Sequence, residues 1–330
     1  MTLGTASALP IAHKYPSAHV LNIRERLFLI DCGEGAQMQM RKYDVQLSKI
    51  DNIFISHLHG DHIFGLMGLL STFGMMNRLA PLYIYAPESM SGYLNYFKEN
   101  FAEGVKYEII FIPVKSSKPK LIYESHNLEI FAFPLKHRGE TYGYLFKEKE
   151  PMLNVRKELI EKYNLSLSEI GALKRGEEVV RISSYLESES SSHSSCDSIY
   201  CVEKDRSCKE ILKNEDFTYL PYKPRSFAYC SDTAPFKKLP EWVRGVDLLY
   251  HEATFASDLT EMAKATYHST AEQAAEVALA AGARRLVIGH YSSRYRDRAL
   301  FVDEAKKIFP NTSSAKEGMK FEIPLEKYKE

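Results

Sequence analysis

Three histidines and an aspartate occur within six residues of this chain, at His57, His59, Asp61 and His62. Imidazole nitrogen and carboxylate oxygen are ligands that zinc and similar divalent ions prefer. The spacing predicts that His57 and His59 lie on one side of an extended turn, whereas Asp61 and His62 begin the following helix. One ion would take the first pair and a second ion the other pair. The alternative is a hydrogen-bonded polar turn without metal.

A site for two ions needs more ligands than these four, and three later residues are candidates. His137, Asp232 and His290 each follow an apolar, strand-like segment. Each of them alone could be a structural or surface residue. Together with the first motif they complete a ligand set, in which the two oxygens of Asp232 could bridge both ions. The predicted metal ligands are therefore His57, His59, Asp61, His62, His137, Asp232 and His290.

The elements that position these side chains are expected to be strands and helices that interleave. A hairpin is expected at 20–30, and a strand at 52–56 leads into the histidine motif. Two later strands end at Glu252 and His290, with a helix over 271–281 between them. This pattern predicts an α/β protein with mixed sheets, in which the strand ends converge on one edge.

Two segments break this pattern. Residues 147–181 contain eight Lys or Arg and seven Asp or Glu, so this segment is nearly neutral, and it looks helical. Residues 183–198 are rich in serine and predict a flexible loop. We expect a single domain over residues 1–330 that carries both segments as insertions.

The composition is that of a protein with a sizeable core, because 45% of its 330 residues are hydrophobic. The formal net charge is zero, which gives no global basic field, although a local patch is enough to hold phosphates. The five cysteines form no disulfide-like framework. The first residues lack the features of a secretory signal, and no apolar run reaches membrane-spanning length. We therefore expect a cytoplasmic protein with no membrane partner.

The order of the predicted ligands resembles that of the dinuclear hydrolases of the metallo-β-lactamase superfamily. The motifs His-Glu-Ala-Thr at 251–254 and His-Ser-Thr at 268–270 are similar to those of the ribonuclease Z family, which processes the 3′ end of tRNA. Residues 173–177 and 221–226 also resemble segments of that family, and the resemblance covers about 3–309. It implies a four-layer αββα sandwich with two Zn²⁺ per subunit, or Mn²⁺ or another divalent ion in their place.

The resemblance implies an endoribonuclease that removes the 3′ trailer from precursor tRNA and leaves a 3′-hydroxyl on the tRNA. Two divalent ions would activate a water molecule and stabilise charge on the phosphodiester. Asp61 would ligate one ion and orient the water or accept its proton. His251 would donate a proton to the departing 3′-oxygen, and Glu252 would fix the tautomer of His251. The alternative for His251 is a buried histidine bonded to the backbone.

His268 and Ser269 have two possible roles. Both are expected to support the site from behind the ligands. Ser269 and Glu272 also have the spacing of a capping box at the start of the helix over 271–281. A purely structural role for Ser269 therefore stays open.

Three basic residues are expected to bind the substrate. Arg294 lies near the presumed ligand His290, and the equivalent arginine of the family is placed near the RNA end, where a guanidinium suits phosphate. The segment 147–181 occupies the place of the family's tRNA-gripping arm, which implies phosphate contacts from Lys174 and Arg175. A surface salt bridge and a solvated helical hairpin are the alternatives. The family is commonly a homodimer, so precursor tRNA and a second copy are the implied partners.

Two other functions compete with this one. Another dinuclear zinc hydrolase of the same superfamily, such as a phosphodiesterase or a lactonase, would lack both the inserted arm and the pair His251 and Glu252. An RNA-binding or scaffold protein with a decayed site would lack some of the ligands, whereas all seven are present in this chain.

Overall fold

A computed structural model describes residues 1–9, 11–184 and 207–328 of the chain. Most of the serine-rich loop expected at 183–198 therefore lies outside the described residues. Contacts divide the chain into two compact units, Met1–Glu148 with Arg225–Ile323 and Lys149–Pro224 with Pro324–Glu330. No helix in the described ranges is long and apolar enough to cross a membrane.

The first unit contains a six-stranded sheet with the order β1-β2-β3-β4-β5-β6. β2 and β3 form the predicted antiparallel hairpin, and β3 to β6 are parallel. Parallel strands end at the same edge of a sheet, so the residues that follow β3 and β4 come close together. The strands are β1 (Thr2–Gly4), β2 (Ala18–Ile23), β3 (Arg26–Cys32), β4 (Ile50–Phe54), β5 (Leu82–Pro87) and β6 (Ile109–Val114).

Helices cover the outer face of this sheet. In α3, Leu66, Leu69, Leu70 and Phe73 follow helical spacing and are buried against the apolar side chains of the strands. The short helix α2 precedes α3 and carries part of the histidine motif. The elements on this side are α1 (Ala36–Lys42), η1 (Leu47–Lys49), α2 (Gly60–Ile63), α3 (Leu66–Met75) and α4 (Met90–Asn100).

The second sheet of this unit has seven strands in the order β17-β16-β15-β14-β9-β8-β7. β14 to β17 are parallel, and β7 to β9 are joined to them in antiparallel pairs. The strands are β7 (Lys120–Glu124), β8 (Leu128–Pro134), β9 (Tyr142–Glu148), β14 (Ser226–Cys230), β15 (Leu248–Glu252), β16 (Leu286–Gly289) and β17 (Thr312–Ser314).

Helices also cover the outer face of the second sheet. The predicted helix over 271–281 is confirmed as α10, but its capping box was assigned to the wrong residues. Thr270 is the N-cap and pairs with Gln273, because the backbone enters the helix one residue later than the spacing of Ser269 and Glu272 suggested. The elements here are α8 (Leu239–Trp242), η2 (Ser257–Leu259), α9 (Thr260–Thr266), α10 (Ala271–Ala281) and α11 (Ala299–Ile308).

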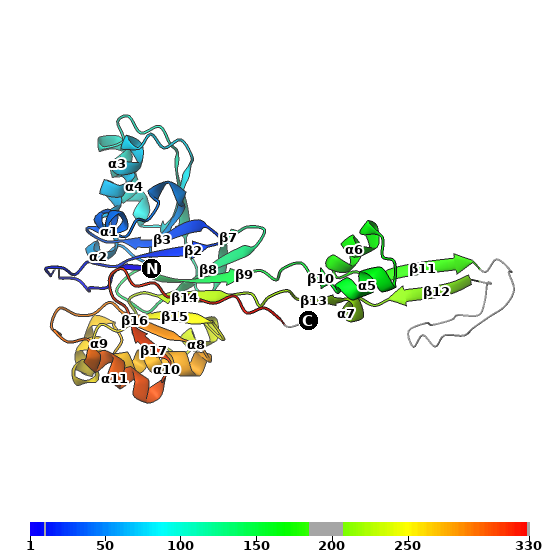
Figure 1. Ribbon diagram of the computed structural model, residues 1–330. Helices are drawn as coiled ribbons and strands as arrows, with labels where there is room; N and C mark the ends of the chain where they lie inside the picture. The colour runs from blue at the N-terminus through cyan, green and yellow to red at the C-terminus, as the bar shows by residue number, and fades with distance from the viewer. Residues whose placement is uncertain (10, 185–206, 329–330) are drawn as a thin grey trace. The chain divides into compact units, whose positions relative to one another are not determined.

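The two sheets pack face to face through a core that is rich in aromatic side chains. Phe28 and Phe54 of the first sheet contact Tyr144 and Phe146 of the second, and all four are fully buried. Helix, sheet, sheet and helix therefore form four layers (Figure 1). This arrangement confirms the predicted αββα sandwich.

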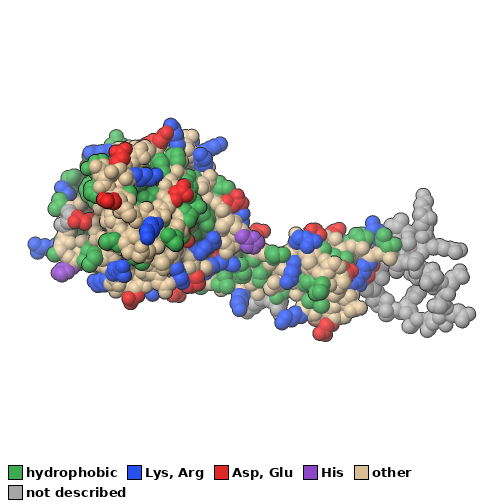
Figure 2. Space-filling view, turned by 90° about the horizontal axis from the view of Figure 1, so that it is seen from above, with side chains coloured by type: hydrophobic (Ala, Val, Ile, Leu, Met, Phe, Trp, Pro, Cys, Tyr) green, Lys and Arg blue, Asp and Glu red, His purple; other side chains and the backbone are tan. Residues whose placement is uncertain are grey.

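The second unit has a small core of its own. Leu165, Leu173 and Phe217 are buried there, and a capping box of Ser166 and Glu169 begins α6. This unit contains strands as well as helices, and it extends beyond the arm expected at 147–181. Its elements are β10 (Asn154–Val155), α5 (Lys157–Lys162), α6 (Leu167–Lys174), β11 (Val179–Ser184), β12 (Ser207–Leu212), α7 (Asn214–Phe217) and β13 (Thr218–Tyr219). Acidic and basic side chains are interspersed on the visible face of both units (Figure 2).

Candidate metal centre

The seven predicted ligands converge in the first unit, and strands of both sheets deliver them. The loop after β4 and helix α2 supply the histidine motif from the first sheet. The second sheet supplies the rest from the segments that follow β8, β14 and β16. The residues brought together are His57, His59, Asp61, His62, His137, Asp232 and His290.

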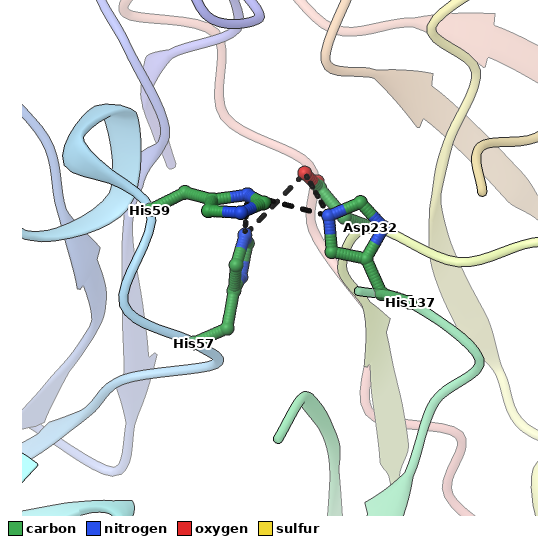
Figure 3. A group of neighbouring side chains, drawn as sticks. All are labelled: His57, His59, His137 and Asp232. Atoms are coloured by element: carbon green, nitrogen blue, oxygen red, sulfur yellow. Dashed lines mark hydrogen bonds and ion pairs between the residues drawn. The ribbon is translucent and has the colours of Figure 1, made fainter. Parts of the chain in front are cut away.

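His57, His59 and His137 form a first ligand group. The Nδ1 atom of His59 lies 3.0 Å from Nε2 of His57 and 3.3 Å from Nε2 of His137. Oδ2 of Asp232 completes the group, at 3.5 Å from Nε2 of His57 and 3.8 Å from Nε2 of His137 (Figure 3). All four side chains point toward one another.

Asp61, His62 and His290 form a second ligand group. Nε2 of His290 lies 3.2 Å from Nε2 of His62 and 3.3 Å from Oδ2 of Asp61. The other oxygen of Asp232, Oδ1, lies 3.3 Å from Nε2 of His290 and 3.5 Å from Nε2 of His62. Asp232 therefore turns one oxygen toward each group, as expected of a bridging carboxylate.

The chemistry of these atoms fits divalent cations. Imidazole nitrogens that face each other at about 3 Å repel unless a proton or a cation lies between them. Oδ1 of Asp232 is buried and accepts no hydrogen bond from the described residues. Burial lowers the pKa of His57 to about 4, which keeps this imidazole neutral, as a metal ligand must be. The donor set of imidazoles and carboxylates suits zinc or manganese.

The second ring nitrogen of four of these histidines is held by a neighbouring group. Such contacts fix the tautomer and the orientation of a ligating imidazole. The partners of Nδ1 are Ser56 Oγ for His57 (3.0 Å), Asp31 Oδ2 for His62 (2.8 Å), the Tyr267 carbonyl for His137 (2.9 Å) and Thr254 Oγ1 for His290 (2.9 Å).

Asp31 is a site residue that the sequence did not reveal. It is fully buried at the end of β3, with a left-handed φ of 55°. Its carboxylate accepts hydrogen bonds from Ser56 N–H (2.7 Å), Ser56 Oγ (2.9 Å), His62 Nδ1 (2.8 Å) and Tyr229 Oη (2.7 Å). Burial alone would raise its pKa, but His62 and these bonds hold the pKa below its ordinary value. The sequence does contain one feature that points to Asp31, because this residue, like the predicted ligands, follows a strand-like segment.

Asp61 lies in the second ligand group and is almost buried. Its Oδ2 accepts a hydrogen bond of 2.8 Å from the Ala8 amide. Burial alone would raise the pKa of Asp61, but the neighbouring His62 and His290 hold it well below its ordinary value. The carboxylate is therefore ionised at neutral pH and is available as a ligand.

Glu252 is fully buried and orients His268. Its Oε1 accepts hydrogen bonds from His268 Nδ1 (2.9 Å) and from the amides of Thr233 and Ser269 (both 3.0 Å). Its Oε2 accepts hydrogen bonds from the amide (2.9 Å) and the hydroxyl (2.8 Å) of Thr254. This network holds a buried carboxylate in the charged form, because every close neighbour donates to it.

The hydrogen bonds of the Glu252 carboxylate in the described part of the chain go to residues other than His251. The two residues are adjacent in β15, and adjacent side chains of a strand point to opposite faces of the sheet. His251 is fully buried, and its Nδ1 bonds the backbone carbonyl of Glu252 (2.7 Å). Its Nε2 has no hydrogen-bond partner among the described residues, and burial lowers its pKa. His251 is thus the buried, backbone-bonded histidine of the alternative interpretation.

His268 lies beside the ligand cluster. Its ring centroid is 5.0 Å from that of His137 and 5.6 Å from that of His290, on which it stacks. Burial alone would lower its pKa, but the carboxylates of Glu252 and Asp232 outweigh this effect and raise the pKa of His268 to about 9 in the metal-free protein. This imidazole, unlike that of His251, is positioned and charged as a proton donor.

Ser269 makes structural contacts next to Glu252 and His268. Its hydroxyl is fully buried and donates a hydrogen bond of 2.6 Å to the backbone carbonyl of Thr233, next to Asp232. Its amide bonds Glu252. Ser269 therefore supports the loops that carry Asp232 and His268, and Thr270 caps the helix in its place.

The basic residues predicted to bind the substrate lie in different surroundings. Arg294 follows His290 by four residues and is exposed. Lys174 and Arg175 belong to the second unit, so the ligand cluster is built without them. Arg175 already forms an exposed two-bond ion pair with Glu177, at 2.7 and 3.0 Å, and such a pair is weak enough to exchange for phosphate.

The fold and the cluster define a class of protein. The family model described as a beta-lactamase superfamily domain matches residues 218–291, and the one described as anti-Pycsar protein Apyc1 matches residues 1–153. The short form of human tRNase Z has a similar structure, with a TM-score of 0.63, 22% identity and coverage of 98% of each chain. YhfI from Bacillus subtilis, a metallo-beta-lactamase fold protein, gives a TM-score of 0.62 at 16% identity and covers 96% of each chain. The chain therefore has the metallo-β-lactamase fold.

Relatives of higher identity narrow this class to one family. Ribonuclease Z of Phocaeicola vulgatus is 41% identical over 97% of this chain and 96% of its own length. Ribonuclease Z of Parabacteroides distasonis is 40% identical over 97% of each protein. The chain belongs to the ribonuclease Z family. This result confirms the predicted family and the predicted class of enzyme, an endoribonuclease.

Proposed function

We propose that this protein removes the 3′ trailer from precursor tRNA by hydrolysing one phosphodiester bond, and that it leaves a 3′-hydroxyl on the tRNA. The observation that carries the proposal is the ion pair of Glu252 and His268 beside a two-group ligand cluster, in a chain of the ribonuclease Z family. The cluster suits activation of water, and the pair suits protonation of a leaving alkoxide.

The cofactors are two Zn²⁺ ions per subunit, with Mn²⁺ or another divalent ion as substitutes. His57, His59 and His137 would hold one ion, Asp61, His62 and His290 the other, and Asp232 both. Ions bound there would activate water and stabilise negative charge on the phosphodiester. Asp61 keeps its charge against burial, and it can orient the attacking water through its carboxylate.

His268 is the proton donor in this proposal. Its Nδ1 is engaged by Glu252, which leaves Nε2 for the 3′-oxygen of the departing ribose. The carboxylate of Glu252 stabilises the imidazolium before transfer and fixes its orientation during transfer. His251 has no part in this step, because it is fully buried and neutral.

The RNA backbone needs positive charge near the cluster and along the second unit. Arg294, four residues after His290 in the sequence, is exposed, and Lys136 and Arg138, on either side of His137 in the sequence, are also exposed. Lys174 and Arg175 would supply phosphate contacts in the second unit. We also propose a homodimer in the cytoplasm, as the family resemblance implies.

The test is the cleavage of a precursor tRNA that carries a 3′ extension. Protein reconstituted with zinc is expected to cut once after the discriminator nucleotide, and mapping of both ends should give a 3′-hydroxyl on the tRNA. Excess chelator should abolish the cut, and added zinc should restore it. Cleavage that resists the chelator, or no cut near the discriminator, would contradict the proposal. Hydrolysis of small phosphodiesters or lactones alone would favour the competing hydrolase.

A further inference from the structure

Thr254 connects two parts of the site that the proposed mechanism treats separately. It follows β15 and is buried, with 2% of the residue exposed. Oγ1 lies 2.8 Å from Oε2 of Glu252, 2.9 Å from Nδ1 of His290 and 3.2 Å from Nδ1 of His268. One hydroxyl thus touches a predicted metal ligand and both members of the proton-donating pair.

The direction of these hydrogen bonds follows from what each group can donate. An ionised carboxylate only accepts, so the single proton of the Thr254 hydroxyl goes to Glu252. Nε2 of His290 lies in the second ligand group, at 3.3 Å from oxygens of both Asp61 and Asp232. With Nε2 serving as a ligand to an ion, the proton of this imidazole would be on Nδ1 and would be donated to Thr254 Oγ1. His268 donates to the other oxygen of Glu252, at 2.9 Å.

A continuous chain of hydrogen bonds therefore runs from His290 through Thr254 to Glu252, where it meets the bond from His268. We propose that Thr254 is a positioning residue that couples the second ligand group to the proton donor. This inference rests on the proposed function for the role of His268. The Thr254 hydroxyl orients His290 for an ion and, through Glu252, orients His268 for the leaving group.

Thr254→Val and Thr254→Ser separate the hydroxyl from the packing of the side chain. Valine keeps the shape and removes the hydroxyl, whereas serine keeps the hydroxyl and removes a methyl group. Thr312→Val is the matched control, because Thr312 is also buried in the second sheet and, among the described residues, its hydroxyl bonds only the carbonyl of Phe309. Thermal unfolding of each variant shows whether it folds.

Two properties of each folded variant are then measured. The first is zinc affinity, measured by competition with a chromogenic chelator. The second is kcat at saturating zinc on two substrates, precursor tRNA and bis(4-nitrophenyl) phosphate. Nitrophenolate leaves as a stable anion and needs little help from a proton donor, so this ester reports on the ions alone.

Thr254→Val is expected to weaken zinc binding about tenfold, because loss of an outer hydrogen-bond partner typically costs 10- to 100-fold. At saturating zinc it should lower kcat on RNA about tenfold and kcat on the ester less than about threefold. Thr254→Ser should restore both values to within about threefold of wild type, and Thr312→Val should change neither.

Unchanged zinc affinity in Thr254→Val would overturn the inference, and so would a Thr254→Ser variant as impaired as Thr254→Val. Equal losses on RNA and ester would also overturn it, because the hydroxyl would then act only on the ligand group. A wild-type protein that does not cut precursor tRNA would refute the proposed function instead. In that case the zinc affinities of the variants still decide whether Thr254 positions His290.

Discussion

Replacement of Asp31 by asparagine should damage both the stability and the metal affinity of this protein. The Asp31 carboxylate receives two hydrogen bonds from Ser56, one from His62 and one from Tyr229. An asparagine can place its carbonyl oxygen at the Oδ2 position and keep three of these donors. Its NH₂ group then faces the Ser56 amide, which leaves two buried donors without an acceptor.

The size of the loss follows from this count. A buried donor left without a partner costs about 1–3 kcal/mol, so two of them cost about 2–6 kcal/mol. This loss is a large share of the free energy of unfolding of a typical domain, which is about 5–15 kcal/mol. His62 also loses a charged partner on Nδ1, which should weaken zinc binding about 10- to 100-fold. Tyr229→Phe removes a single donor to Asp31 and should cost about 1 kcal/mol.

Urea unfolding of the metal-free protein measures the stability, and the single tryptophan, Trp242, reports on the first unit. This indole packs against Phe133 and Phe236, so its fluorescence should change when the outer helices separate from the second sheet. Tyr144→Phe is the control for zinc affinity, because the partners of its buried hydroxyl in the described part of the chain are backbone carbonyls alone. An Asp31→Asn protein that unfolds at the wild-type urea concentration and binds zinc equally well would refute this reasoning.

Three further predictions concern catalysis, metal and pH. His268→Ala should lower single-turnover cleavage of precursor tRNA about 10²- to 10⁴-fold at unchanged zinc content, whereas His251→Ala should mainly lower the melting temperature; the opposite pattern would return the proton donor to His251. Removal of metal should lower the melting temperature measured by calorimetry, and zinc should raise it in a concentration-dependent way. The hydrogen bond from Arg181 and the cap at Ser166 lower the pKa of Glu169 to about 2, so their stabilising effect is present above about pH 4.5 and is lost as pH falls toward 2. Hydrogen exchange of α6 amides should follow this profile and lose it in Glu169→Gln.

The ligand set could be predicted from the sequence because metal chemistry restricts both residue type and spacing. His57, His59, Asp61 and His62 are neighbours in the chain, so local geometry brings them together. The hairpin at 20–30 and the helix at 271–281 were also predictable, since each shows its own periodicity and turn residues. These features depend on contacts within a few residues.

The partners of the ligands could not be predicted in the same way, because they depend on strand register. Asp31 reaches His62 through the parallel pairing of β3 with β4, and Thr254 reaches His290 through that of β15 with β16. The spacing of residues along the chain does not reveal which strands pair or in what register. Strand pairing in the second unit was not predicted for the same reason. The interspersed charges of this segment predicted helices, whereas β11 and β12 form an antiparallel pair.

The pair His251 and Glu252 shows why adjacency in the sequence does not establish a contact between two side chains. Two polar residues side by side suggest a hydrogen-bonded couple, but in a strand they face opposite layers of the sandwich. Leu249 packs among the outer helices, so His251, two residues later, lies on that same helix-covered face. Tyr250 packs between the sheets, and Glu252 therefore faces the ligand cluster. Once the strand direction is known, alternation alone assigns Glu252 to the site and directs the search for its partner to other elements, where His268 lies.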